Sequence, residues 1–154
     1  FSCRSKTMKL VLLICVLIAS CLARVSVKVR VHGSLTCTQT PFRYGIRLED
    51  DDSPFRNDII GEIRERDSKN YTEYFDVSGT ASEFWPGDDE VEPYVLLYHF
   101  CMTKFNCGCK KLGKISEDLD VEINIKFPHP GPEWGPENCA KEECMLLDPT
   151  GWQL

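Results

Sequence analysis

The cysteines are the residues of this 154-residue chain whose number and placement most directly predict chemistry. Nine are present, and three of them fall within residues 1–23. The other six form an even set, which in an exported chain is typical of a disulfide framework. Six thiols allow about 15 pairings, and their spacing selects none of them. The six are Cys37, Cys101, Cys107, Cys109, Cys139 and Cys144.

A metal centre is the alternative chemistry for part of this set. His99, Cys101, Cys107 and Cys109 offer the nitrogen and sulfur ligands that zinc prefers. The single residue between Cys107 and Cys109 is a shorter gap than the usual two to four or so residues between zinc ligands. We therefore predict disulfides, no metal and no cofactor.

Carboxylates and histidines are the other residues that could bind a metal ion or catalyse a reaction. Asp50, Asp51 and Asp52 are hard oxygen ligands that could suit calcium, but the spaced ligands and terminal bidentate Glu of a calcium loop are missing. A solvated turn is the prediction there. His99 ends an apolar strand, where we expect a hydrogen-bonded structural role. No Ser-His-Asp set, phosphate loop or pair of catalytic carboxylates can be argued from the spacing, so no catalytic residue is predicted.

The segment from Met8 to Ala23, MKLVLLICVLIASCLA, has the layout of a secretory signal peptide. Its apolar part is shorter than the ~18 residues needed to span a membrane. We predict cleavage after Ala23 or after Cys21, a secreted extracellular protein and no stable membrane insertion. A lipidated Cys21 is the alternative, because residues 18–21 resemble a lipobox. Residues 1–7 are interpreted as non-native leader or translated upstream sequence.

The charge that remains after residue 23 restricts the partners. Residues 1–23 carry three basic and no acidic side chains, so 15 of the 18 basic and all 24 acidic residues remain, a net charge of −9. This balance argues against nucleic acid and anionic lipid as partners. Asn70 begins the only glycosylation sequon, Asn70-Tyr71-Thr72, and we predict a glycan or an unmodified turn there.

Alternating apolar residues predict an all-β fold. Valines at odd positions from Val25 to Val31, and apolar residues at odd positions from Val121 to Phe127, have the period of half-buried strands. Turn residues at regular spacing separate the segments, which predicts an antiparallel β-sandwich of about seven strands. A helical turn is considered at residues 81–85. Further strands are expected at Tyr44–Leu48, Ile59–Arg64, Tyr71–Val77, Pro93–Cys101 and Met145–Leu147.

The predicted domain covers residues 24–127, and a Pro-rich, cysteine-tethered tail covers 128–154. The segment FPHPGPEWGP, residues 127–136, holds four prolines and is expected to be a surface loop.

Three motifs resemble the nematode transthyretin-like protein family. The first is Val29–Cys37 followed by Pro41 and Gly45–Asp52. The second is Phe75–Thr80 with Glu83, and the third is Glu92–Cys101, which ends in Tyr-His-x-Cys. The resemblance covers about Val27 to Phe127 and implies a secreted transthyretin-like β-sandwich. Its members mostly have no assigned activity.

Local chemistry adds roles for motif residues. Gly33 is expected to form a bulge or strand exit where a side chain would clash. Cys37 is expected to pair with Cys101, Cys107 or Cys109. Cys139 and Cys144 are expected to hold the tail, through each other or through the remaining cysteines.

The predicted function is a non-enzymatic binding or signalling module with an extracellular protein or cell-surface receptor as partner. Its surface would be the loops Asp50–Asp58 and Ser82–Val91, with Phe84 and Trp85 as aromatic anchors or core caps beside Asp88 and Asp89. Two alternatives rest on the resemblance. One is a small hydrophobic ligand carrier. The other is a 5-hydroxyisourate hydrolase using His32 and Arg47, which the ending Gly151–Leu154 disfavours because the hydrolase ends in Tyr-Arg-Gly-Ser.

Overall fold

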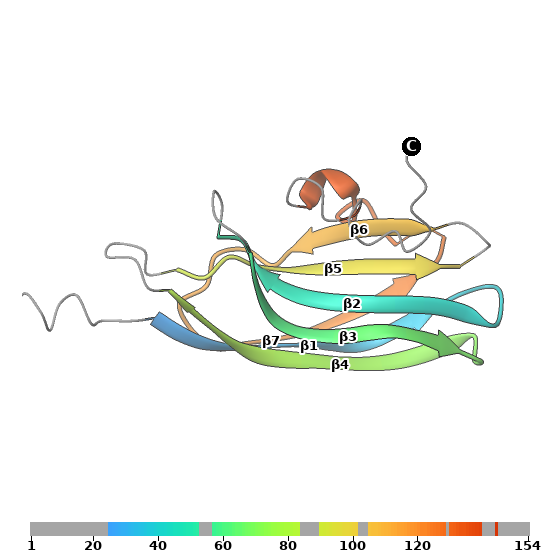
Figure 1. Cartoon of the computed structure of the whole chain (residues 1–154), viewed down its shortest axis with the longest axis horizontal. Coiled ribbons are helices and arrows are strands. Elements are labelled where there is room, and N and C mark those ends of the chain that lie inside the picture. Colours follow the sequence, from blue (N-terminus) through green and yellow to red (C-terminus); the bar gives the residue numbers. More distant parts are fainter. Residues whose placement is uncertain are drawn as a thin grey trace, which may run out of the picture.

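The computed structural model describes residues 25–52, 57–83, 90–101, 105–128, 130–139 and 144, and they form two packed β-sheets (Figure 1). The predicted all-β sandwich of about seven strands is confirmed. Among the described residues no helix is long and apolar enough to cross a membrane. The strands are β1 Val25–Thr36, β2 Phe42–Asp50, β3 Asp58–Ser68, β4 Thr72–Glu83, β5 Pro93–Phe100, β6 Asn106–Lys111 and β7 Leu119–Lys126, followed by the 3-10 helix η1 Pro136–Asn138.

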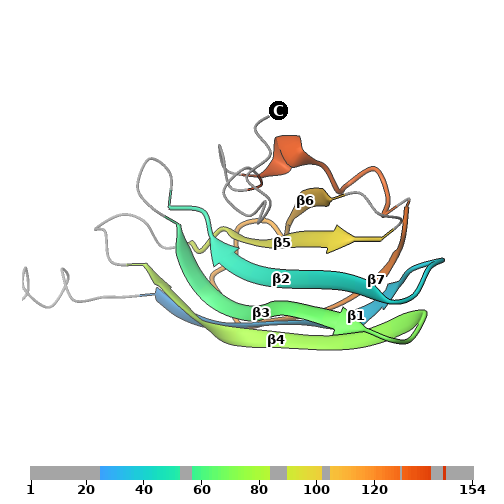
Figure 2. The ribbon, with the colours of Figure 1, turned by 45° about the vertical axis from the view of Figure 1, so that its right-hand side comes forward.

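The two sheets have different strand orders. One has three strands in the order β4-β1-β7, and the other has four in the order β3-β2-β5-β6. Figure 2 shows the two layers, with β1 and β4 beneath β2 and β5. Four of the five strand pairs are antiparallel, but β1 and β7 run parallel. This pair departs from the purely antiparallel arrangement that the turn spacing predicted.

The alternating valines of β1 form the centre of the core. Val27, Val29 and Val31 are fully buried, while the residues between them face outward. On β7, Ile123 and Ile125 are buried in the same way. Residues one apart along a strand point to opposite faces, so this pattern gives each strand one apolar and one polar face. The sequence pattern therefore identified both strands and their buried faces.

Gly33 lies inside β1 at a close backbone contact. A Cβ atom at this position would lie 1.8 Å from the carbonyl oxygen of Ile123 on the neighbouring β7. The expected clash is confirmed. The expected bulge or strand exit is wrong, because β1 continues to Thr36 with unbroken register to both neighbours.

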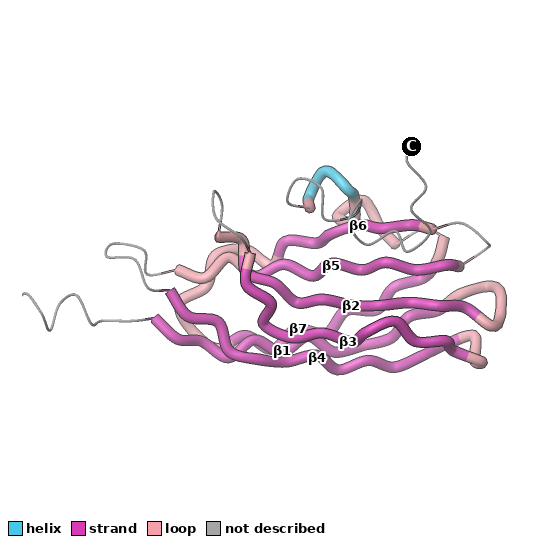
Figure 3. The backbone as a smooth tube through the Cα atoms, in the orientation of Figure 1, coloured by secondary structure: helices cyan, strands magenta, loops and turns pink. Residues whose placement is uncertain are grey.

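Strand β5 is buried on both faces, as its continuous apolar sequence indicated. Val95 and Leu97 face the other sheet and join the main core. Tyr94, Leu96 and Tyr98 face the opposite way and pack with Cys109 in a second cluster, to which Cys139 also packs. The C-terminal part of the chain therefore covers the outer face of this sheet. In Figure 3 the 3-10 helix η1 lies beside β6.

Two expected elements differ in the structure. The seventh strand is β6, which was not predicted, whereas Met145–Leu147 lies outside the described residues. The helical turn considered at residues 81–85 is wrong for residues 81–83, which belong to β4 and pair with β1. Phe84 and Trp85 lie outside the described residues.

Candidate functional site

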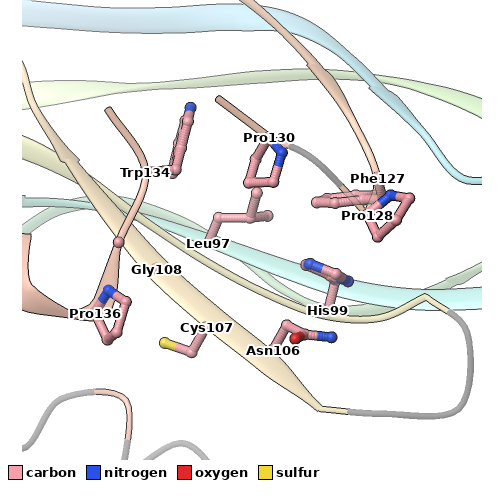
Figure 4. Close-up of a pocket in the computed structure, with 11 residues that line it drawn as sticks. Leu97, His99, Asn106, Cys107, Gly108, Phe127, Pro128, Pro130, Trp134 and Pro136 are labelled. Carbon is pink, nitrogen blue, oxygen red and sulfur yellow. The ribbon is translucent and has the colours of Figure 1, made fainter. Parts of the chain in front are cut away.

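A pocket of about 130 Å³ lies where the chain returns from β7 to the edge strand β6 (Figure 4). Its walls come from β5, from β6 and from the proline-rich segment, the name used here for residues 127–136. The lining residues are Leu97, His99, Asn106, Cys107, Gly108, Phe127, Pro128, Pro130, Trp134, Gly135 and Pro136. Small-molecule sites are lined mostly by apolar and aromatic side chains, and this pocket has such side chains but is smaller than the usual ~300–1,000 Å³.

His99 is the buried polar residue of this pocket. Its side chain is only 6% exposed, and its ring lies on Phe127 with the ring centroids 3.6 Å apart. Burial lowers the pKa of His99 to about 4, because the charged imidazolium loses its hydration. The imidazole is therefore neutral at physiological pH.

The neutral ring has a defined tautomer. The backbone N–H of Cys101 donates a hydrogen bond to Nδ1 of His99 at 3.2 Å, so Nδ1 is the acceptor and the proton resides on Nε2. Figure 4 shows the imidazole among Leu97, Asn106 and Pro128, with one ring nitrogen directed towards the middle of the pocket. Since Nδ1 is occupied by Cys101, Nε2–H is the donor available there. The structural role expected for His99 accounts for Nδ1 alone.

Backbone contacts hold the proline-rich segment against β6. Gly135 forms an isolated bridge with Cys109, with N–O distances of 3.1 and 3.4 Å. Within the segment the Trp134 N–H donates to the Gly131 carbonyl at 3.2 Å. Trp134 is buried in the main core. The expected loop conformation is confirmed, but the segment is partly interior and does not lie wholly on the surface.

All six cysteines after residue 23 are in disulfides. Cys37 pairs with Cys101, one of its three expected partners. Cys107 pairs with Cys144, and Cys109 pairs with Cys139. The tail is thus held through the CGC motif of β6 and not by a Cys139–Cys144 bond. The thiolates that a zinc site would need are consumed in these bonds.

A second candidate centre joins the ends of β2 and β4. One carboxylate oxygen from each of Asp50, Asp52 and Glu83 lies within 4.8 Å of the others. Among the described residues, these carboxylates could hold a divalent cation. The predicted solvated turn is wrong for Asp50, which ends β2 and is 3% exposed. Burial raises the pKa of Asp50 to about 6, the Asp52 charge adds to this, and the bond from the Glu92 N–H opposes it.

The residues weighed for a hydrolase lie on different sheets. His32 is on β1, where its Nε2 lies 3.2 Å from Oδ1 of Asp120. Arg47 is on β2, where its Nη1 lies 3.3 Å from Oε1 of Glu49. Glu49 is buried and also accepts a hydrogen bond from the hydroxyl of Tyr94 at 2.5 Å. The buried Glu49 carboxylate links β2 to β5 through these contacts, which explains its burial without a catalytic role.

The remaining predicted site residues can be placed only in part. Asn70 is exposed in the turn between β3 and β4, where a glycan can be attached. Phe84, Trp85, Asp88 and Asp89 lie outside the described residues, so the predicted partner surface stays a prediction.

The pocket beside His99 was not predicted from the sequence. The signal that could have identified it is Trp134, a large apolar residue inside a proline-rich stretch. Tryptophan is uncommon in exposed loops, because burial of its large side chain contributes much favourable free energy.

No known family, curated protein or solved structure matches the chain.

Proposed function

We propose that the protein is an exported, disulfide-stabilised and non-enzymatic binding or signalling module that acts through an extracellular protein or cell-surface receptor. The transthyretin-like resemblance of its three motifs belongs to the same proposal. The observation that supports it most is the pairing of every cysteine after residue 23 into three disulfides. Such a set persists in oxidising compartments and is rare in the cytosol.

The placement of His32 and Arg47 supports a non-enzymatic role. The two residues lie on different sheets, and each has a carboxylate beside it. General acid–base work requires the groups to reach one substrate, within hydrogen-bond distance of the atoms that exchange protons.

Secretion from cultured animal cells tests the export. We expect a product in the medium that begins near Arg24 and resists alkylation until it is reduced. The matched control is Leu13→Arg, which places a charge in the apolar part of residues 8–23 and should keep the chain in the cells. A wild-type chain that stays inside, or that arrives with several reactive thiols, would contradict the proposal.

Binding to intact cells tests the partner. Labelled protein should bind saturably, and Trp85→Ala should weaken binding about tenfold or more if Trp85 is an anchor. Tyr74→Ala is the matched control, since Tyr74 is an aromatic residue on β4 with 80% exposure and lies outside the predicted loops. Equal binding of both variants would remove the predicted loop from the partner surface.

A small hydrophobic ligand carrier is the second candidate function. The pocket beside His99 is the observation that favours it, because it combines apolar walls with one buried donor.

A further inference from the structure

We propose that the pocket between β5, β6 and the proline-rich segment binds a small neutral aromatic compound whose oxygen accepts a hydrogen bond from Nε2–H of His99. This inference rests on the carrier candidate and names the chemical class of its ligand. It does not depend on export or on a protein partner.

The donor is the first step of the argument. His99 is 94% buried, being 6% exposed, and its Nδ1 is already used by the Cys101 N–H. No acceptor contacts Nε2–H among the described residues. Buried polar groups in proteins are almost always paired with protein, water or ligand, and a ligand oxygen in the pocket would supply an acceptor for this N–H.

The size and the walls of the pocket define the shape of the ligand. A cavity of about 130 Å³ is close to the ~150 Å³ that accommodates a benzene ring in an engineered protein cavity. Phe127 and Trp134 offer aromatic surfaces, and Pro128, Pro130 and Pro136 offer compact apolar ones. Offset or edge-on packing against aromatic walls favours a flat ring over a flexible chain.

The charges around the pocket indicate a neutral ligand. The imidazole is uncharged, so it gives an anion no ion pair, and its N–H donor repels a cation. Lys110 on β6 pairs with Glu133, with Nζ and Oε1 3.4 Å apart, and no lysine or arginine is among the lining residues. Burying an unpaired charge is costly, which excludes both ionic classes.

Two isosteric probes test the hydrogen bond. Acetophenone and isopropylbenzene have nearly the same shape, but only acetophenone carries a carbonyl acceptor. Isopropylbenzene leaves water more readily than acetophenone, so each Kd is first corrected for the transfer of the probe from water to an alkane. After this correction we expect acetophenone to bind the full chain with about fivefold lower Kd, the gain typical of one hydrogen bond. Calorimetry gives both constants, and NMR shifts of the Trp134 indole N–H and the His99 ring nitrogens locate the ligand.

Variants separate the donor from the pocket. His99→Phe keeps an aromatic ring beside Phe127 and removes Nε2–H, so the alkane-corrected Kd values of the two probes should then be equal. Tyr74→Ala, remote from the pocket, should leave both constants unchanged. Because the comparison of the two probes uses the wild-type chain, the test stands even if His99→Phe does not fold.

The possible outcomes distinguish the inference from the function it rests on. Equal alkane-corrected Kd values of both probes for the wild-type chain would overturn the role of His99 and leave a carrier possible. No binding of either probe at their solubility limits would overturn the inference and the carrier together. Shifts confined to residues outside the pocket would overturn its location.

Discussion

The two long sides of the sandwich are closed in different ways. On one side, the edge strands β3 and β4 approach backbone to backbone: a Cβ at Gly79 would lie 1.9 Å from the carbonyl oxygen of Ile60. On the other side, the chain leaves β7 and crosses to β6 as the proline-rich segment. Phe127 and Trp134 join the core there, and the pocket beside His99 lies there.

The comparison explains why the candidate site lies on one side of the sandwich and not on the other. Glycines remove the side chains that would keep two sheets apart, so the backbones of β3 and β4 come close together at Gly61 and Gly79. On the other side the proline-rich segment fills the space between β7 and β6. The disulfides Cys107–Cys144 and Cys109–Cys139 attach the chain that follows it to β6. The candidate site lies on the side where the sheets do not meet directly.

The largest expected effect comes from removing the disulfide between the two sheets. Cys37→Ala with Cys101→Ala should lower the free energy of unfolding by about 4 kcal/mol, because this bond closes a loop of 64 residues. Cys109→Ala with Cys139→Ala opens a loop of 30 residues and should cost about 3 kcal/mol. Urea denaturation measures both. A larger loss for the second pair would mean that the β6–β7 side carries more of the stability than we infer.

A pair of glycine substitutions compares the two sides directly. Gly79→Ala should cost about 2–3 kcal/mol, because its methyl group would meet backbone atoms of β3 that cannot move away. Gly108→Ala, on β6, should cost under about 1 kcal/mol, since its nearest new neighbour is the Gly135 nitrogen at 3.5 Å. Thermal melting reports both values, and similar losses would refute the contrast between the sides.

The carboxylates at the ends of β2 and β4 should make the free energy of unfolding depend on pH. The pKa of Asp50 is raised from 3.8 to about 6 in the folded chain, so the folded state holds the proton more tightly than the unfolded state. Stability from this residue is full below pH ~3.8 and is lost as the pH rises through about 6. Asp50→Asn should therefore raise the free energy of unfolding at pH 7 by about 2 kcal/mol and flatten this part of the profile.

Asp76→Asn is the matched control for this experiment. Asp76 is exposed, and its hydrogen bond from Arg30 lowers the pKa of its carboxyl group. Its removal should change stability little and in the opposite direction. A pH profile that Asp50→Asn leaves unchanged would show that another group titrates.

The smallest expected effect on stability is at the turn between β3 and β4. Asn70→Gln should remove a glycan's mass from the secreted protein while changing the free energy of unfolding by less than ~0.5 kcal/mol, because Asn70 is exposed. Asn124→Gln, an exposed residue of β7 outside any sequon, should leave the mass unaffected apart from the substitution. Mass spectrometry decides, and an unchanged sugar content in Asn70→Gln would refute the glycan.

Residue patterns predicted some elements well because their burial is local in the sequence. The alternation in β1 and β7 and the two-sided apolar run of β5 reflect faces that are buried along the whole strand. Strand β6, with the sequence NCGCKK, lacks such a pattern, because cysteines and glycine provide its buried contacts. The parallel direction of the β1–β7 pair depends on distant segments and leaves no local signal.

The candidate sites were harder to predict for a similar reason. Asp50, Asp52 and Glu83 meet only because β2 and β4 end beside each other. The pocket beside His99 exists only because the proline-rich segment returns to β6, and the bridge between Gly135 and Cys109 that fixes this return joins residues 26 apart.

The parallel pair also affects how the nascent chain matures. Strand β1 is the central strand of its sheet, and its partner residues on β7 lie 90 residues later, as Val29 and Leu119 do. A ribosome adds about 5–20 residues per second, so the edge of β1 that pairs with β7 stays without its partner strand for several seconds. Bare apolar edges promote aggregation. We therefore expect chains truncated before Leu119 to be insoluble and the growing polypeptide to need chaperones until that point.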